Sequence, residues 1–319
     1  MNRFIPDPFI PILLATVVLA TLFPAAGPAA DRLGTLATAA VMLLFFLHGI
    51  KLPRENLVAA LVNWRLHLFI LGTTYVAFPL LGLAVSKLWP SLLPANLWAG
   101  VLFLCALPST VQMSIAFTSI ARGDVAASVT SAAMSNLLGI VLTPLLAGAL
   151  LHAQNGAGVP LSGVWKVVKQ LLLPFVAGHL LHPLLADWAA RRRLLISWSD
   201  RLTILLSVYS AFSAAVIDGI WSRIPLSTLL LTALVCAAML ALAMLFLLNG
   251  ARLAGLPRAE QRSALYCGAF KSVVSGVPMA RVLFPSGEIG AMILPLMMYH
   301  QLQMMVSATL APRQAKRDS

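Results

Sequence analysis

Long apolar runs separated by short polar breaks recur along the whole chain. Windows close to the roughly 20 residues that cross a lipid bilayer can be placed ten times. They are 9–24, 33–50, 66–86, 97–121, 125–150, 166–186, 202–218, 227–249, 262–284 and 288–309. The pattern predicts an all-α polytopic membrane protein with ten transmembrane helices and a lipid bilayer as its surroundings.

The first window has an alternative interpretation. Residues 9–23 follow Arg3 and precede an Ala- and Pro-rich patch, as in a cleaved signal peptide. Further apolar windows follow, however, and Pro8, Pro11 and Pro28 are poorly suited to a signal sequence. A first transmembrane helix is therefore preferred.

Composition agrees with the hydrophobic pattern. Of the 319 residues, 60% are hydrophobic and 10% are charged, against roughly 25% charged in soluble domains. The tryptophans fall at or just beyond the ends of the windows, where indole favours the membrane interface. The net charge of +12 comes from basic residues scattered among loops, which argues against nucleic-acid binding. Cys105, Cys236 and Cys267 lie in apolar segments and imply neither a disulfide nor a metal site.

The distribution of basic residues predicts the orientation. Fifteen of the 22 Lys and Arg residues fall in loops on the side that holds both termini. Six, including Arg281, fall in loops on the other side, which leaves Lys271 as the basic residue inside a span. Because cytoplasmic loops are enriched in Lys and Arg, both termini are expected in the cytoplasm.

The longest polar, glycine-bearing break near the middle divides the windows into five and five. With an odd number of spans in each half, the second half must insert upside down, as in many secondary transporters. The predicted organisation is a first repeat at 1–150, a linker at 151–165, an inverted second repeat at 166–310 and a basic cytoplasmic tail at 311–319.

The fourth window of each half carries helix breakers and polar residues, which marks the predicted site. Paired interruptions at corresponding positions point to a transport site. The predicted breaks are Pro108, Gly268, Gly276 and Pro278. The predicted binding residues in these two windows are Ser109, Thr110, Gln112, Ser114, Thr118, Lys271, Ser272 and Ser275. The alternative is that these small residues only allow close helix packing.

Lys271 lies too deep in its span to reach the interface easily. A charge at that depth costs on the order of 2.5–3.5 kcal/mol, so it should face the protein interior or a wet cavity. Three interpretations are open. The ammonium is held by backbone carbonyls and Gln112, or the amine is neutral because burial disfavours its charge, or the lysine only tethers two broken helices.

The fifth window of each half supplies the other candidate residues. Ser128 and Ser131 share a helical stripe with Ser135, and Asn136 is adjacent. His300 and Gln301 lie mid-segment in the tenth window. These residues form either the wall of a cavity or a packing seam, and His300 alone is more often a core histidine. Acidic residues map to loops or span ends, so no carboxylate is expected at mid-membrane.

At Pro108–Pro144 and Cys267–Phe284 the sequence resembles the bile acid:sodium symporter family, in an SBF-like bacterial branch. The blocks that carry the resemblance read "PSTVQMSIAFTSIA", "CGAFKSVVSGVPM" and, at Phe45–Glu55, "FFLHGIKLPRE". The resemblance implies ten helices in two inverted five-helix repeats, a core and a panel domain, and broken helices 4 and 9 that cross beside the substrate cavity. It also implies a location in the bacterial inner membrane.

The resemblance further implies two sodium ions held by helices 4, 5 and 9, with a helix 9 glutamate central to both. Ser114 and Ser128 keep hydroxyls that could serve one Na+, and no other cofactor is implied. Tyr266 stands where the glutamate is expected, and Phe270 and Lys271 stand near an expected Gln-Asn pair. An ammonium could therefore occupy the place of a bound cation.

The leading hypothesis is a secondary active transporter, not an enzyme, that carries an anionic, amphipathic, bile-acid-like solute by alternating access. One alternative is a non-transporting membrane regulator that keeps the fold. The other is an intramembrane hydrolase with a serine nucleophile and Lys271 as base, for which the sequence shows no nucleophile signature.

Overall fold

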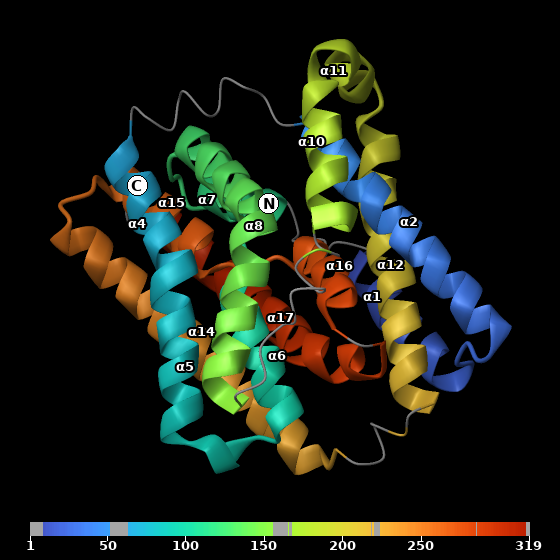
Figure 1. Cartoon of the computed structure of the whole chain (residues 1–319). Helices are drawn as coiled ribbons and strands as arrows, with labels where there is room; N and C mark the ends of the chain where they lie inside the picture. The colour runs from blue at the N-terminus through green and yellow to red at the C-terminus, as the bar shows by residue number, and fades with distance from the viewer. Residues whose placement is uncertain are drawn as a thin grey trace. The chain divides into compact units, whose positions relative to one another are not determined.

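The computed structural model describes residues 9–51, 63–155, 165, 168–217, 219, 224–284 and 286–316. All regular structure in these ranges is helical (Figure 1). Six of the described helices are long and apolar enough to cross a membrane, or eight if each of two bent helix pairs counts as a span. The all-α, multi-pass prediction is confirmed at this level, whereas the ten-helix repeat stays a prediction.

The chain folds as two compact units, and each unit takes segments from both halves of the sequence. Unit 1 comprises residues 1–51, 165–225 and 277–291, and unit 2 comprises 52–164, 226–276 and 292–319. The predicted division at 151–165 rests on sequence position, and most of that linker lies outside the described residues.

Unit 1 is a group of helices packed around α2. Its elements are α1 (Phe9–Leu22), α2 (Pro28–Lys51), the π-helix η3 (Val168–Leu172), α10 (Leu173–Leu180), α11 (His182–Arg191) and α12 (Arg193–Ile217). Helix α10 packs on α2, and α12 packs on α1 and α2 (Figure 1). A Cβ at Gly49 would lie 2.1 Å from the Phe175 carbonyl oxygen, and one at Gly178 would lie 2.0 Å from that of Phe46. Glycine at both positions therefore lets the backbones of α2 and α10 approach closely.

Two predicted segments of unit 1 differ from the structure. The segment predicted at 166–186 is bent by 92° between α10 and α11. Pro183, at the second position of α11, has no N–H to donate to the preceding turn, so the helix cannot continue straight. The helix that corresponds to the segment predicted at 202–218 is α12, which begins at Arg193. Its first turns contain polar residues, which the apolar window did not include.

Unit 2 contains the segments predicted to carry the site. Its first elements are α4 (Trp64–Gly72), the π-helix η1 (Thr73–Ala77), α5 (Phe78–Leu88), the short 3₁₀ helix η2 (Pro90–Leu92), α6 (Ala95–Ala106), α7 (Val111–Ile120) and α8 (Val125–Asn155). Its later elements are α14 (Leu226–Leu253) and α15 (Arg258–Ala269). Helix α8 packs on α6 and α7, and α15 packs on α14 and α7. Every residue of α6 from Leu97 to Ala106 is buried, so α6 forms the centre of the unit.

Two helices contain the boundary between the units. Helix α16 (Val273–Leu283) starts in unit 2 and ends in unit 1, whereas α17 (Ser286–Lys316) starts in unit 1 and ends in unit 2.

Candidate functional site

The first helix break separates α6 from α7, whose axes differ by 64°. The backbone leaves the helical conformation at Leu107 and becomes helical again at Val111. Pro108 explains the break, because its ring clashes with the preceding turn and it has no N–H to donate. The sequence-based prediction of an interruption at Pro108 agrees with this geometry.

The second break lies at Phe270–Ser272, between α15 and α16. The breaks predicted at glycine and proline positions of this segment require correction. Gly268 is the next-to-last residue of α15, and Gly276 and Pro278 lie inside α16. No proline or glycine stands where the helix is interrupted, so the interruption is held by tertiary contacts.

The two breaks contact each other inside unit 2. The Ser272 N–H donates to the Pro108 carbonyl oxygen at 2.9 Å, so the start of α16 is tied to the end of α6. Non-helical backbone is tolerated at membrane depth only where it is buried in protein or lines a cavity. Pro108 and Ser272 are both buried.

Helix α8 supplies partners for the backbone groups that the first break leaves unpaired. The Ser109 N–H donates to Ser135 Oγ at 3.0 Å, and Asn136 Nδ2 donates to the Ser109 carbonyl at 2.7 Å. Thr143 Oγ1 donates to the Ala106 carbonyl at 2.8 Å. These side chains compensate for helical hydrogen bonds that the break removes.

Helix α17 does the same for the second break. The Lys271 N–H donates to Gln303 Oε1 at 2.9 Å, and Gln303 Nε2 donates back to the Lys271 carbonyl at 3.2 Å. The Tyr299 hydroxyl donates to the Ala269 carbonyl at 2.8 Å. Gln303 and Tyr299 were not among the predicted site residues, although their position beside His300 at mid-span is the sequence signal that marks them.

The Lys271 side chain is completely buried and reaches carbonyl oxygens of the first break. Its Nζ donates to Leu107 at 2.9 Å, to Cys105 at 3.1 Å and to Thr74 at 3.2 Å. The Phe78 ring centroid lies 4.2 Å from the same nitrogen, within the range of a cation–π contact. Carbonyl oxygens of the first break and of Thr74 therefore hold the Lys271 side-chain nitrogen.

Gln112, the other expected partner of Lys271, is exposed on α7. Within the described residues, the hydrogen bonds of the Lys271 ammonium go to the three carbonyls and to no serine hydroxyl. A serine nucleophile activated by Lys271 has no geometric support here.

Each of the three carbonyls is free for a structural reason. The Phe78 N–H bonds to Thr73 in the π-helix, and Pro79 has no N–H, so Thr74 lacks its usual helical donors. The Cys105 carbonyl would accept from Ser109 in a continuous helix, but that N–H goes to α8. Leu107 lies at the break itself, where its carbonyl has no following helical turn.

The candidate sodium ligands lie in two hydroxyl pairs. Ser114 Oγ donates to the Tyr266 carbonyl at 3.1 Å and lies 3.1 Å from Ser109 Oγ. Ser128 Oγ donates to Thr118 Oγ1 at 2.9 Å. All four hydroxyls of these pairs are buried, and each faces a neighbouring oxygen.

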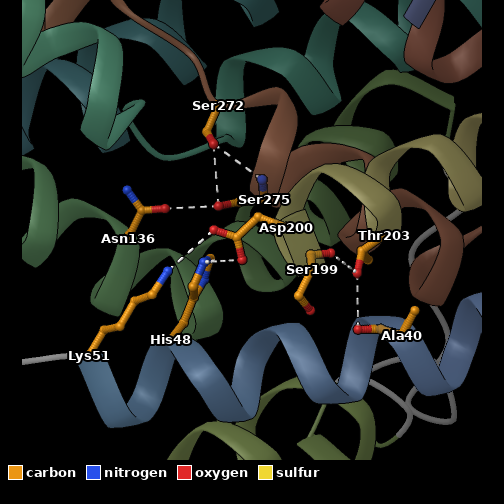
Figure 2. Close-up of polar contacts among 9 residues, drawn as sticks. All are labelled: Ala40, His48, Lys51, Asn136, Ser199, Asp200, Thr203, Ser272 and Ser275. Carbon is orange, nitrogen blue, oxygen red and sulfur yellow. Dashed lines mark hydrogen bonds and ion pairs between the residues drawn. The ribbon is translucent and has the colours of Figure 1, made fainter. Parts of the chain in front are cut away.

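A further polar chain lies at the start of α16. The Ser272 hydroxyl donates to Ser275 Oγ, which in turn donates to Asn136 Oδ1 (Figure 2). These two hydrogen bonds are 3.3 and 2.8 Å long. Asn136 is half-buried, whereas the two serines are buried. This chain joins both breaks to α8 and includes a side chain that is accessible.

The remaining predicted site residues are Ser131, His300, Thr110 and Gln301. Ser131 pairs with His67 Nδ1 at 2.7 Å, and His300 Nδ1 lies 2.9 Å from Gln303 Nε2. Thr110 is buried with its hydroxyl 3.4 Å from Ser114 Oγ, and Gln301 is half-buried on α17.

Unit 1 contains two charged side chains that sequence analysis placed in loops or at span ends. Asp200 is a buried residue of α12, 3.4 Å from His48 Nε2 and 3.4 Å from Lys51 Nζ (Figure 2). Arg281 is a half-buried residue of α16 that donates to Ser210 Oγ at 2.7 Å and to the Gly34 carbonyl at 2.9 Å. Asp200 was misplaced because α12 begins before the predicted window at 202–218, whereas Arg281 lies inside the predicted window at 262–284 and was counted with the loop residues.

Comparison with known proteins gives a consistent result. The model of the SBF-like CPA transporter family matches residues 7–316. An uncharacterized protein of Pseudomonas aeruginosa is 46% identical over 315 residues, which cover 99% of this chain and 95% of the relative. The Escherichia coli K12 protein YfeH, provisionally named a symporter, is 46% identical over 307 residues, covering 96% and 92%.

More distant relatives are vertebrate proteins. Sodium/bile acid cotransporter 7-B of Xenopus laevis is 27% identical over 325 residues, which cover 98% of this chain and 92% of the relative. The resemblance inferred from the sequence is thereby confirmed. The chain belongs to the SBF-like CPA transporter family and is a multi-pass membrane transporter.

Proposed function

We propose that the protein is a secondary active transporter that moves an organic, anionic, amphipathic solute by alternating access. The observation that carries this proposal is the contact between the two helix breaks, with the polar chain of Asn136, Ser275 and Ser272 beside it. Interrupted helices that meet at membrane depth are how many secondary transporters form a binding site.

The proposed architecture is ten helices in two inverted repeats. The α6–α7 and α15–α16 breaks occupy the fourth predicted span of each half, as an inverted repeat requires. A core and a panel domain, each assembled from both repeats, would also divide the chain as units 1 and 2 divide it. We place both termini in the cytoplasm and the protein in the bacterial inner membrane, following the loop charges and the bacterial relatives.

An anionic solute is supported by the positive groups available to it. Helices α7 and α16 both begin at a break, and the N-terminus of a helix carries partial positive charge. Lys271 is fully buried with its side-chain nitrogen already held by three carbonyls, so we assign contact with the solute to these helix N-termini and to the polar chain of Asn136, Ser275 and Ser272.

Uptake by purified protein in proteoliposomes tests the proposal. With taurocholate as the amphipathic anion, we expect uptake above that of protein-free liposomes. Ser275→Ala should lower uptake severalfold, because it removes a polar contact of the chain at the start of α16. Ser119→Ala, at an exposed serine of α7, is the matched control.

Three results, from this assay and from two companion measurements, would contradict the proposal. Absence of flux for a broad panel of organic anions, together with a bound partner at 1:1 ratio, would favour the regulator. Serine labelling by a fluorophosphonate would favour the hydrolase. Unchanged uptake by Ser275→Ala would remove this polar chain from solute binding.

Imposing a sodium gradient in the same assay tests coupling. We assign Ser114 and Ser128, with Thr118, as the ligands of a coupling Na+, because their hydroxyls lie in buried pairs. If uptake rises with inward Na+, Ser128→Ala should abolish the rise. If Ser128→Ala keeps the full rise, this assignment is wrong.

A further inference from the structure

We propose that the ammonium of Lys271 occupies a monovalent-cation site built from backbone carbonyls, and that Na+ or a small alkylammonium binds there when the side chain is removed. The site lies entirely in unit 2, between η1 and the first break. Its cation is covalently attached to the chain and therefore cannot be released.

The arrangement matches the chemistry of a cation site. An ammonium has three N–H donors, and each of them has one carbonyl acceptor, at 2.9, 3.1 and 3.2 Å. Unwound backbone carbonyls and the C-terminal ends of half-helices are the groups that hold Na+ in transporters with broken helices. The Phe78 ring adds a face that attracts cations.

Neutral groups alone compensate the charge. Among the described residues, no carboxylate lies within ion-pair distance of Lys271. A fully buried charge without an ionic partner requires strong, oriented dipoles, which the three carbonyls provide. Because these dipoles are directed at a position and not at a particular side chain, another small cation can replace the ammonium.

The carbonyls are fixed independently of Lys271. Pro79 and the π-helix free the carbonyl of Thr74, and the contact of Ser109 with α8 frees that of Cys105. Removing the lysine side chain therefore leaves the oxygens in place and without donors. An empty site of this kind is costly, because each unpaired buried acceptor loses its hydrogen bond.

This inference bears on coupling. If the protein transports as proposed above, a tethered cation at this position cannot carry the free energy of an ion gradient. Any sodium coupling must then use another position, such as the Ser114 and Ser128 hydroxyls. The cation site itself does not depend on the transport proposal, since its test needs no solute.

The test measures thermal stability of the purified, detergent-solubilised full chain in choline, sodium or ethylammonium chloride at equal ionic strength. Lys271→Ala should melt below wild type in choline and gain about 3–6 °C in sodium or ethylammonium, since a ligand of the folded state raises Tm. Wild type should melt at the same temperature in choline and in ethylammonium. Any rise of wild type in sodium would report Na+ at the Ser114 and Ser128 hydroxyls, so the gain of Lys271→Ala is counted above it. Ethylammonium should act most strongly, because its carbons fill part of the space of the lysine stem.

Two control variants separate the cation site from general destabilisation. Lys271→Met fills the stem space without a charge, so it should be destabilised and show no response to cations. Lys87→Ala removes an exposed lysine of the same unit and should behave as wild type. If Lys271→Ala cannot be purified in choline, its recovery when ethylammonium is present from solubilisation onwards becomes the measurement.

Equal recovery or equal melting of Lys271→Ala in all three salts would overturn the proposal. So would a sodium-specific rise in wild type that disappears in Lys271→Ala, because the lysine would then support a separate cation instead of replacing one. Either result leaves the transport assay unaffected, so failure here is distinguishable from failure of the proposed function.

Discussion

The two units each bury a charged side chain, and they neutralise it in different ways. In unit 2, Lys271 is completely buried and is held by three backbone carbonyls. In unit 1, the Asp200 side chain is 12% exposed and lies beside His48 and Lys51, whose side chains are 27% and 38% exposed. One charged group is held by fixed neutral dipoles, and the other lies beside an imidazole and a lysine side chain that are partly exposed to solvent.

This difference predicts how each region responds to its surroundings. Backbone dipoles are fixed by the fold, so added salt changes their effect little. Ion pairs that are open to solvent are screened by salt, with a Debye length that falls from about 10 Å at 0.1 M to about 3 Å at 1 M. Stability that depends on Asp200 should therefore vary with ionic strength, and stability that depends on Lys271 should not.

The largest effect is expected for Lys271→Glu. A carboxylate in place of the ammonium would face three carbonyl oxygens and no donor, and an uncompensated buried charge costs about 3–5 kcal/mol. We expect little or no monodisperse protein by size-exclusion chromatography. Wild-type recovery of this variant would show that the carbonyls are not fixed and would remove the contrast between the units.

Gln303→Leu should have the next largest effect on unit 2. It leaves the buried N–H and carbonyl of Lys271 without partners, at an expected total cost of about 2–4 kcal/mol in the free energy of unfolding. The loss should appear as a lower Tm that is the same at low and high salt. Gln301→Leu, two residues earlier and half-buried, is the control and should change Tm little.

Asp200→Asn should have a smaller effect, and one that depends on salt. It removes the charge that attracts His48 and Lys51 while keeping the shape of the side chain. We expect a loss of about 1–2 kcal/mol at low salt, because the pair is only partly buried. Denaturant unfolding at low and high salt measures it, and a loss that does not shrink at high salt would contradict the comparison.

Lys51→Ala should have the smallest effect. Its side chain is 38% exposed, and exposed ion pairs contribute about 0–1 kcal/mol. His48 still lies 3.4 Å from Asp200 in this variant. A loss as large as that of Asp200→Asn would show that Lys51, and not His48, provides most of the compensation.

The sequence predicted the features that depend on local residue type. Pro108 has no N–H to donate and its ring clashes with the preceding turn, so a break could be predicted at this residue, although Pro278 lies inside α16 without interrupting it. Lys271 was expected to be sheltered by oxygen atoms because hydrocarbon does not tolerate an ammonium. The family resemblance and the multi-pass fold follow from patterns that cover the whole chain.

The features that were missed depend on contacts between residues far apart in the sequence. The second break has no proline or glycine at Phe270–Ser272, and its unpaired backbone groups find partners at Pro108 and Gln303. Asp200 was misplaced because a window average ends a span where polarity rises, whereas a helix can continue once its polar side chains have partners.

Helix α8 holds the first break in its non-helical conformation. Three of its side chains, those of Ser135, Asn136 and Thr143, are each hydrogen-bonded to the main chain of the break. Straightening the broken segment would forfeit all of these bonds together. In the proposed alternating-access cycle, the first break and helix α8 should therefore move together as a rigid body, and the segment should not rewind into a continuous helix.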